Sequence, residues 1–265
     1  MRFAEKGDFP AVRALWETCF PDEGGFNDYF FTHFYKEKYT LLYLEGETLV
    51  AMVQMLPYRM TAGGVSREVT YIYGACTDPA HRRKGYMARL LERSFELDRE
   101  AGRIASVLIP AEKWLFDFYK PFGYEPFFHI SRREITCTAG ERKAPRRLTS
   151  ADVPALAALY DKWVPKCRIE RDTAYWNAQL ALFDTLGAGV YGWFKDETLT
   201  GYAFCWEDNA QELLGADDAQ MQGLMQTLDR GTLTVTETGS EIALGVCKWH
   251  EKADETAGYM NLMLN

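Results

Sequence analysis

The chain of 265 residues has no excess of basic residues, no long hydrophobic run and no closely spaced pair of cysteines. Its net charge of −8 argues against nucleic-acid binding, which requires a basic face. No stretch approaches the roughly 20 apolar residues of a membrane-spanning helix, and the N-terminal residues lack the apolar core of a signal peptide. The sequence therefore predicts a cytoplasmic protein that binds neither nucleic acid nor a membrane.

The cysteines and histidines are few and scattered. Such spacing is typical of reduced thiols rather than of a disulfide framework, and it places no ligands at the intervals of a zinc site. We therefore expect no metal. The residues concerned are Cys19, Cys76, Cys137, Cys167, Cys205, Cys247, His33, His81, His129 and His250.

Charge is divided unevenly between the two halves of the chain. Residues 1–146 hold 21 Lys and Arg against 20 Asp and Glu, a net of +1, whereas residues 147–265 hold 9 against 18, a net of −9. The acidic half could attract a cationic partner. A solvated acidic surface that keeps the protein in solution explains the same excess.

Apolar periodicity in the first half predicts alternating strands and helices. Helices are expected at 8–20, 27–35, 86–99 and 114–120, and strands at 39–44, 49–55, 65–76, 104–109 and 127–137. This order is typical of a mixed α/β (α+β) sheet, complete by about residue 138. We therefore expect a first domain over residues 1–138.

Residues 139–146 form a polar linker, and a second domain is expected over residues 147–265. Its opening, Ser150 to Pro154 followed by an apolar helix pattern, echoes Gly7 to Pro10, and a hairpin follows in both halves. The final strand is expected at 258–264. We interpret the pattern as a decayed internal duplication in which the second unit is degenerate. This unit lacks a counterpart of the basic loop described next, and we expect it to act as a scaffold or substrate wall.

The stretch 71–88 carries the strongest functional signal. An apolar strand leads through a basic loop, Arg82, Arg83 and Lys84, to Gly85, and a helix pattern begins at once. The start of a helix presents unsatisfied N–H groups and the positive end of the helix dipole, which together bind anions. The pattern indicates a phosphate-bearing ligand.

Coenzyme A fits this pattern better than a nucleotide. Successive N–H groups from Arg83 through Gly85, Tyr86 and Met87 to Ala88 can bind its pyrophosphate, with Arg82 and Lys84 adding charge. Its amide-rich pantetheine arm can pair with a strand edge, here Ala75, Cys76 and Thr77. A Walker loop would need Lys followed by Ser or Thr, and a Rossmann fingerprint would need three glycines; neither is present. A plain strand-to-helix turn with surface arginines is the alternative.

The segment Thr77 to Met87 resembles the acetyl-CoA signature of the GNAT acetyltransferase superfamily, R-x-x-G-x-G/A after a strand. Met87 departs from the usual Gly or Ala. The chain resembles most the Eis-like tandem branch, in which a degenerate GNAT domain follows the first, but without the sterol-carrier-like third domain of that branch. The resemblance implies two tandem GNAT-like units and acetyl-CoA as acyl donor.

Tyr119 is the expected catalytic residue. The segment around it resembles a region of many GNAT enzymes whose tyrosine donates a proton to the departing thiolate, and a thiolate leaving a poorly solvated cleft needs such a proton. Packing within an aromatic helix is the alternative for this side chain. The general base stays open among Glu23, Asp28, Glu112 and the C-terminal carboxylate of Asn265.

The sequence thus predicts an N-acetyltransferase that moves an acetyl group from acetyl-CoA to a primary amine on a small molecule or peptide. The alternatives are a catalytically silent acyl-CoA sensor or scaffold and an enzyme with a different acyl donor. A transient acyl group on Cys76 is conceivable, but a small buried side chain is the simpler interpretation. Aromatic residues expected to be exposed over Phe26–Tyr35 leave room for a homodimer.

Overall fold

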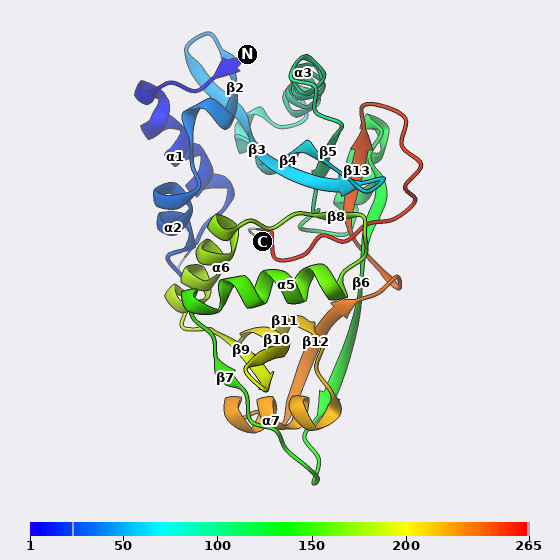
Figure 1. Cartoon of the computed structure of the whole chain (residues 1–265). Coiled ribbons are helices and arrows are strands. Elements are labelled where there is room, and N and C mark those ends of the chain that lie inside the picture. The colour runs from blue at the N-terminus through cyan, green and yellow to red at the C-terminus, as the bar shows by residue number, and fades with distance from the viewer. Residues whose placement is uncertain (23, 264–265) are drawn as a thin grey trace. The chain divides into compact units, whose positions relative to one another are not determined.

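The chain folds into two compact units, which are described here for residues 1–22 and 24–263 of a computed structural model (Figure 1). The first unit comprises Met1–Phe127 and Gly245–Thr256, and the second comprises Phe128–Leu244 and the segment from Ala257 onward. Each unit has a mixed sheet with helices packed on it, so the expected α/β fold class is confirmed.

The first unit is built on a sheet in which β4 and β5 run parallel and the other neighbours run antiparallel. Its strands, in sheet order, are β1 (Arg2–Phe3), β2 (Thr40–Glu45), β3 (Thr48–Ala62), β4 (Val65–Thr77), β5 (Ala105–Leu108) and β13 (Ile242–Trp249). The helices are α1 (Phe9–Cys19), α2 (Phe26–His33), α3 (Tyr86–Glu100) and α4 (Trp114–Tyr119), with 3₁₀ turns at Lys6–Asp8, Glu37–Tyr39, Pro79–His81 and Lys120–Phe122.

Helix α3 forms because its apolar side chains recur at helical spacing on one face. Leu90, Leu91 and Phe95 on that face are buried, and they pack in one cluster with Val53 of β3 and Ile72 of β4. This packing fixes the start of α3 close to the end of β4.

The second unit repeats the strand order of the first. Its strands are β6 (Glu125–Thr136), β12 (Thr232–Thr238), β11 (Asn209–Leu214), β10 (Thr198–Trp206), β9 (Gly189–Lys195) and β7 (Arg146–Arg147), with the short β8 (Arg168–Ile169) outside this path. The helices are α5 (Val153–Trp163), α6 (Thr173–Thr185) and α7 (Asp218–Leu228), with a 3₁₀ turn at Ser150–Asp152. As in the first unit, the one parallel pair of described strands, β11 with β12, flanks a helix.

The closing strands are exchanged between the two halves of the sequence. We expected Phe127–Cys137 to close the first sheet, but β6 pairs with β12 through Ile130–Thr136. The strand beside β5 is β13, paired through Val246–Trp249, and its late position in the chain is visible from its colour (Figure 1). This exchange explains why the first compact unit ends at Phe127 rather than at residue 138 and regains a segment near the C-terminus.

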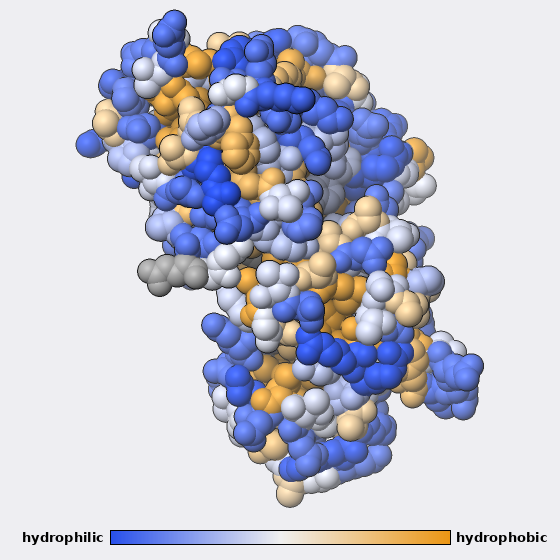
Figure 2. All heavy atoms as spheres, turned by 90° about the vertical axis from the view of Figure 1, so that its left-hand side faces the viewer, coloured by the Kyte–Doolittle hydropathy of each residue, from blue (hydrophilic) through white to orange (hydrophobic). Residues whose placement is uncertain are grey.

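Two further expectations are wrong. Residues 258–263 do not form a strand and contribute only isolated bridges at Gly258 and Tyr259; Leu264 lies outside the described residues. The aromatic side chains of α2 are mostly buried, so this helix offers no exposed aromatic face for a dimer. The face that carries α1 and α2 shows hydrophilic side chains with small hydrophobic areas between them (Figure 2).

Candidate functional site

A bulge near the end of β4 opens the sheet. Met52 of β3 lies opposite Cys76, but the next paired residue of β3, Gln54, lies opposite Tyr73, so Gly74 and Ala75 together face one residue. Gly74 has a φ of +53°, which suits glycine. The ladder between β4 and β5 stops at Tyr71, whereas β4 continues to Thr77. The edge of β4 beyond the bulge is therefore open to an extended ligand.

The loop after β4 delivers the chain to the start of α3. Asp78 caps the turn Pro79–His81 by accepting a hydrogen bond from the Ala80 N–H at 2.8 Å. Arg83 and Gly85 both have positive φ, of +63° and +79°. The first hydrogen bond of α3 runs from the Arg89 N–H to the Gly85 carbonyl. The N–H groups of the first turn therefore point out of the helix unsatisfied, as an anion site requires.

The surroundings of these N–H groups fit a phosphate group. Arg82, Arg83 and Lys84 are exposed beside them. A Cβ built on Gly85 meets no atom within 4 Å, so the space in front of the loop is open and the glycine keeps it clear. Arg82 also donates from Nε to the carbonyl oxygen of Thr77 at 3.2 Å, which ties the basic loop to the end of β4.

Polar contacts hold this loop in place from β2. The Tyr86 hydroxyl donates to Glu45 at 2.7 Å, and this hydrogen bond raises the pKa of Tyr86. His81 contacts the carboxylate of Asp78 at 3.1 Å and that of Glu45 at 3.7 Å. The contact with His81, together with the Ala80 N–H, lowers the pKa of Asp78. His81 is thus engaged in supporting the loop.

Tyr119 lies at the C-terminal end of α4 and is buried. It belongs to the same hydrophobic cluster as Tyr86 and Leu108, at the start of α3 and the end of β5. Its ring packs edge-on against Tyr124 with centroids 5.5 Å apart, and no hydrogen bond to its hydroxyl is found in the described chain. Burial raises the pKa of Tyr119 to about 12. The hydroxyl is therefore protonated at neutral pH and has its proton free to donate.

The candidates for the general base are not brought together. Asp28 on α2 pairs with Arg13 of α1 at 2.5 Å. Glu112 is exposed in the segment before α4. Glu23 and Asn265 lie outside the described residues.

The second unit has a bulge at the position equivalent to that of β4. Phe204 of β10 lies opposite Glu212, and the next residue, Cys205, lies opposite Ala210, so Gln211 bulges. Here the edge is filled by the chain itself, because the Asn261 side chain donates to the Gln211 carbonyl at 2.8 Å. The C-terminal segment thus covers the edge of β11, whereas the equivalent edge of β4 in the first unit is open.

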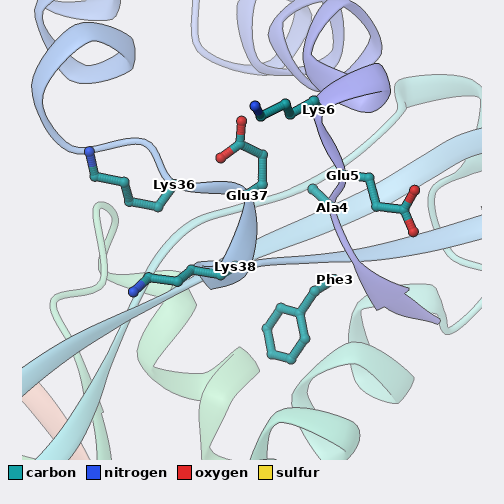
Figure 3. A pocket seen from close by; sticks show the side chains of 7 residues that line it. All are labelled: Phe3, Ala4, Glu5, Lys6, Lys36, Glu37 and Lys38. Atoms are coloured by element: carbon teal, nitrogen blue, oxygen red, sulfur yellow. The ribbon is translucent and has the colours of Figure 1, made fainter.

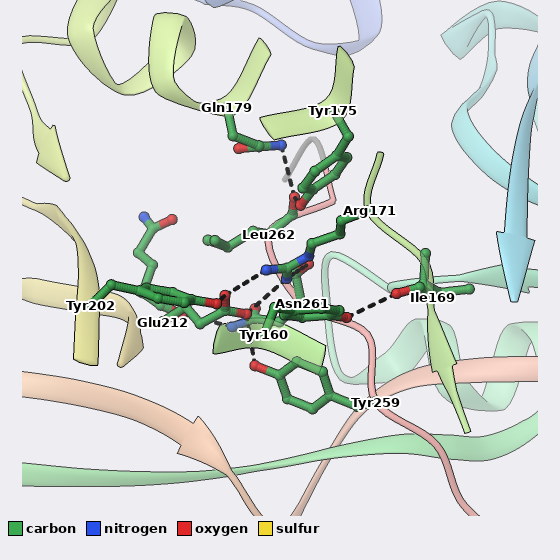
Figure 4. A network of polar contacts seen from close by, with 11 residues as sticks. Tyr160, Ile169, Arg171, Tyr175, Gln179, Tyr202, Glu212, Tyr259, Asn261 and Leu262 are labelled. Atoms are coloured by element: carbon green, nitrogen blue, oxygen red, sulfur yellow. Dashed lines mark hydrogen bonds and ion pairs between the residues drawn. The ribbon is translucent and has the colours of Figure 1, made fainter. Parts of the chain in front are cut away.

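A buried polar network fixes that segment (Figure 4). Arg171 forms a two-pronged ion pair with Glu212 at 2.6 and 2.8 Å, and it also donates to the Asn261 carbonyl at 2.9 Å. The hydroxyls of Tyr202 and Tyr259 each donate to Glu212 at 2.7 Å. Burial acts to raise the pKa of Glu212, but Arg171 and the two hydroxyls outweigh it and lower this pKa overall. The carboxylate is therefore ionised and fully paired.

The helix that follows β11 starts with acidic residues. Asp217 caps α7 by accepting from the Gln220 N–H at 2.8 Å, and Asp218 follows it in the first turn. A carboxylate thus occupies the N-terminal donors that are free in α3. The start of α7 therefore does not present the free N–H groups that the start of α3 presents.

A separate cavity of about 540 Å³ lies at the other end of β2 from the basic loop (Figure 3). It is lined by the last residue of β1, the residues that follow β1 and residues shortly before β2, with both signs of charge: Phe3, Ala4, Glu5, Lys6, Lys36, Glu37 and Lys38. Because Glu45, at the far end of β2, is the residue that contacts Tyr86, this cavity is not the candidate site.

Two kinds of feature are absent from the described residues. No helix among the described residues is long and apolar enough to cross a membrane. Within residues 1–22 and 24–263, no three His, Cys, Asp or Glu side chains gather as metal ligands would.

Sequence reasoning missed how tightly α1 packs on the bulge. A Cβ on Gly74 would lie 2.1 Å from the ring of Trp16, so this glycine is required by the close approach of the helix as well as by its φ. A glycine within an otherwise apolar strand was the available signal.

The first unit is similar to a known family of domains. Residues 1–127 match the family model described as an acetyltransferase (GNAT) domain. No curated protein matches the sequence of the chain significantly.

Solved structures resemble almost the whole chain. A GCN5-related N-acetyltransferase from Anabaena variabilis has a TM-score of 0.72 at 15% identity, over 93% of this chain and 71% of that one. Eis1 from Mycobacterium abscessus has a TM-score of 0.64 at 14% identity, over 94% and 73%. N-myristoyltransferase from Saccharomyces cerevisiae, with bound myristoyl-CoA, has a TM-score of 0.61 at 10% identity, over 97% and 87%. At these identities the likeness establishes the fold.

Proposed function

We propose that the protein is an N-acetyltransferase that transfers the acetyl group of acetyl-CoA to a primary amine on a small molecule or peptide. The observation that carries the proposal is the open edge of β4, which leads directly into the unsatisfied N-terminus of α3 beside three basic side chains. Bound there, acetyl-CoA would supply the activated thioester. The acidic second half favours a cationic amine as acceptor.

Each part of the site has a task in this proposal. The first-turn N–H groups of α3, from Tyr86 to Ala88, bind the pyrophosphate, with charge added by Arg82 and Lys84. The edge Ala75–Thr77 pairs with the pantetheine amides. Tyr119 donates its proton to the departing sulfur, because its raised pKa keeps it protonated.

Strand alternation suggests which N–H stabilises the developing oxyanion. The Asp78 N–H donates to Val50 of β3 at 2.9 Å, so it points toward β3. Successive N–H groups of a strand point to opposite edges, and the Thr77 N–H therefore points to the open edge. We assign it the role of oxyanion donor.

The decisive experiment measures CoA release from acetyl-CoA with a panel of polyamines, aminoglycosides and peptide amines. Release that depends on one class of amine supports the proposal. CoA binding without turnover on any amine would instead indicate a silent acyl-CoA sensor. Mass spectrometry of the ligand retained on purification tests the donor, because a longer acyl group would contradict acetyl-CoA.

Neutralising the basic loop is expected to weaken CoA binding. In the double variant Arg83→Gln/Lys84→Gln, loss of two cationic groups beside the phosphate site should raise the Kd for CoA roughly tenfold at low salt. The difference should shrink as ionic strength rises, because exposed charges are screened. Isothermal titration calorimetry measures both. Arg93→Gln is the control: it removes a charge that lies within α3 and is paired with Glu96, so Kd should stay unchanged. Equal Kd values for the parent, the double variant and Arg93→Gln would contradict the proposed phosphate site.

A further inference from the structure

Two cysteines that are distant in sequence meet at the end of β4. Helix α1 packs on this strand, with Trp16 over Gly74 and, one turn later, the Cys19 sulfur 3.6 Å from the Thr77 carbonyl oxygen. Cys76 precedes Thr77, and its thiol lies close enough to that of Cys19 for the two to influence each other's protonation. The pair therefore lies at the strand edge that the site uses.

The two sulfurs differ in protonation and exposure. Interaction with the Cys76 thiol and with the nearby Arg82 outweighs burial and lowers the pKa of Cys19 to about 7. Interaction with the Cys19 thiol and burial raise the pKa of Cys76 well above its usual range. Cys19 is partly exposed, whereas Cys76 is buried. A partly exposed thiolate beside a second thiol is the arrangement of a redox-sensitive cysteine and its resolving partner.

The remaining cysteines lack this arrangement. Cys167, Cys205 and Cys247 are buried, and burial raises the pKa of Cys205 to about 12. Cys137 is partly exposed, and its sulfur lies 3.9 Å from a guanidinium nitrogen of Arg142. It therefore provides a matched control for exposure next to an arginine.

We propose that Cys19 and Cys76 form an oxidation site at which hydrogen peroxide converts the two thiols into a disulfide. The Cys19 thiolate attacks peroxide, so that an S–O bond forms, the O–O bond breaks and hydroxide leaves, taking up a proton as water. The sulfur of Cys76 then attacks the sulfenic acid, an S–S bond forms, and the hydroxyl leaves with the Cys76 proton as a second water. Two thiols lose two electrons, and peroxide gains them.

Disulfide formation has a consequence that rests on the proposed function. Covalent bonding draws Cys76 toward α1 and thereby displaces the edge Ala75–Thr77. We expect the oxidised protein to bind CoA at least tenfold more weakly than the reduced protein.

The test is peptide mapping under non-reducing conditions after treatment of the full chain with hydrogen peroxide. We expect a Cys19–Cys76 linked peptide that a dithiol reductant cleaves. Cys76→Ser should stop at a sulfenic acid on Cys19, trapped by dimedone, and Cys19→Ser should abolish both products. Cys137→Ser should form the disulfide as the parent does.

The outcomes separate the two proposals. A reduced Cys19 at peroxide levels that oxidise Cys137, or a dimedone adduct on Cys19 that persists in the parent protein, would overturn the oxidation site. Failure of the reduced protein to bind CoA would contradict the proposed function and leave the disulfide result intact. Equal CoA affinity of both redox forms would overturn the coupling between disulfide and binding.

Discussion

Replacing Tyr119 by phenylalanine is expected to lower kcat for acetyl transfer by roughly a hundredfold or more, because the departing sulfur loses its proton donor. The Kd for acetyl-CoA should stay within about twofold, since the hydroxyl has no place in the phosphate or pantetheine contacts. Stopped-flow turnover and calorimetric binding, measured on the same protein, separate the two effects.

The substitution is well suited to this test because the ring stays in place. No partner of the Tyr119 hydroxyl is found in the described chain, so its removal should leave no buried group unpaired. Tyr124→Phe is the matched control: it removes a hydroxyl from the neighbouring ring and breaks a hydrogen bond of 2.6 Å with Ser106. That variant should lose about 1 kcal/mol of stability but little kcat. Equal turnover in Tyr119→Phe and the parent would remove Tyr119 from the mechanism.

The pH dependence of the transfer rate tests the same role of Tyr119 as proton donor. With a pKa of about 12, Tyr119 keeps its proton throughout an assay from pH 6 to 10. The rate should therefore rise with pH as the acceptor amine loses its proton, without a basic decline from this tyrosine. An alkaline loss of kcat below pH 10 that vanishes in Tyr119→Phe would contradict this assignment.

The fold class and the basic loop were predictable because their signals are local. Gly85 between a basic loop and the amphipathic pattern of Leu90, Leu91 and Phe95 places a helix start directly after a strand. The structure has that helix from Tyr86 to Glu100. Local pattern and tertiary packing agree here, since the apolar face of the helix is the face that packs on the sheet.

Strand partners were not predictable, because pairing joins residues far apart in the sequence. Nothing in the sequence of Phe127–Cys137 shows whether this strand pairs in the first sheet or in the second, since each sheet offers an apolar edge strand as a partner. Its pairing partner, β12, begins only at Thr232. The meeting of Cys19 and Cys76 was hidden for the same reason: it depends on how α1 packs over the bulge at Gly74.

The buried ion pair of the second unit left no local signal. Polar residues precede Glu212 in β11, so nothing in its neighbourhood marks it as buried. Its burial depends on the rest of the second unit, and a carboxylate cannot be buried without partners. The cation that pairs with it, Arg171, lies about forty residues earlier in the chain.

Arg171→Met is expected to destabilise the second unit by about 3–5 kcal/mol, because it leaves Glu212 buried without its cation. For a chain of this size, the thermal midpoint should fall by roughly 6–20 °C. Differential scanning calorimetry measures the change. Arg147→Met is the matched control in the same unit: its ion pair with Asp184 is exposed, and its loss should cost less than about 1 kcal/mol.

The sign of the pH dependence separates an unpaired charge from a simple loss of packing. In the parent, Glu212 has a lowered pKa, so its contribution to stability is present at neutral pH and is lost only as pH falls through that pKa. In Arg171→Met, burial without the cation raises the pKa of Glu212 above its usual value, so the folded state takes up a proton more readily than the unfolded state. The variant should therefore gain stability, relative to the parent, as pH falls from 7 to 5.

Removing both charges completes the argument. In Arg171→Met/Glu212→Leu no buried charge is left unpaired, and the double variant should be more stable at pH 7 than Arg171→Met alone. It should not recover fully, because Tyr202, Tyr259 and the Asn261 carbonyl lose their partners. Its thermal midpoint should also differ from the parent by a nearly constant amount between pH 5 and 7. Two results would contradict the charge-pairing argument: stability losses that add up in the double variant, and a difference in thermal midpoint between Arg171→Met and the parent that does not change at low pH. They would show that the network stabilises the C-terminal segment through packing.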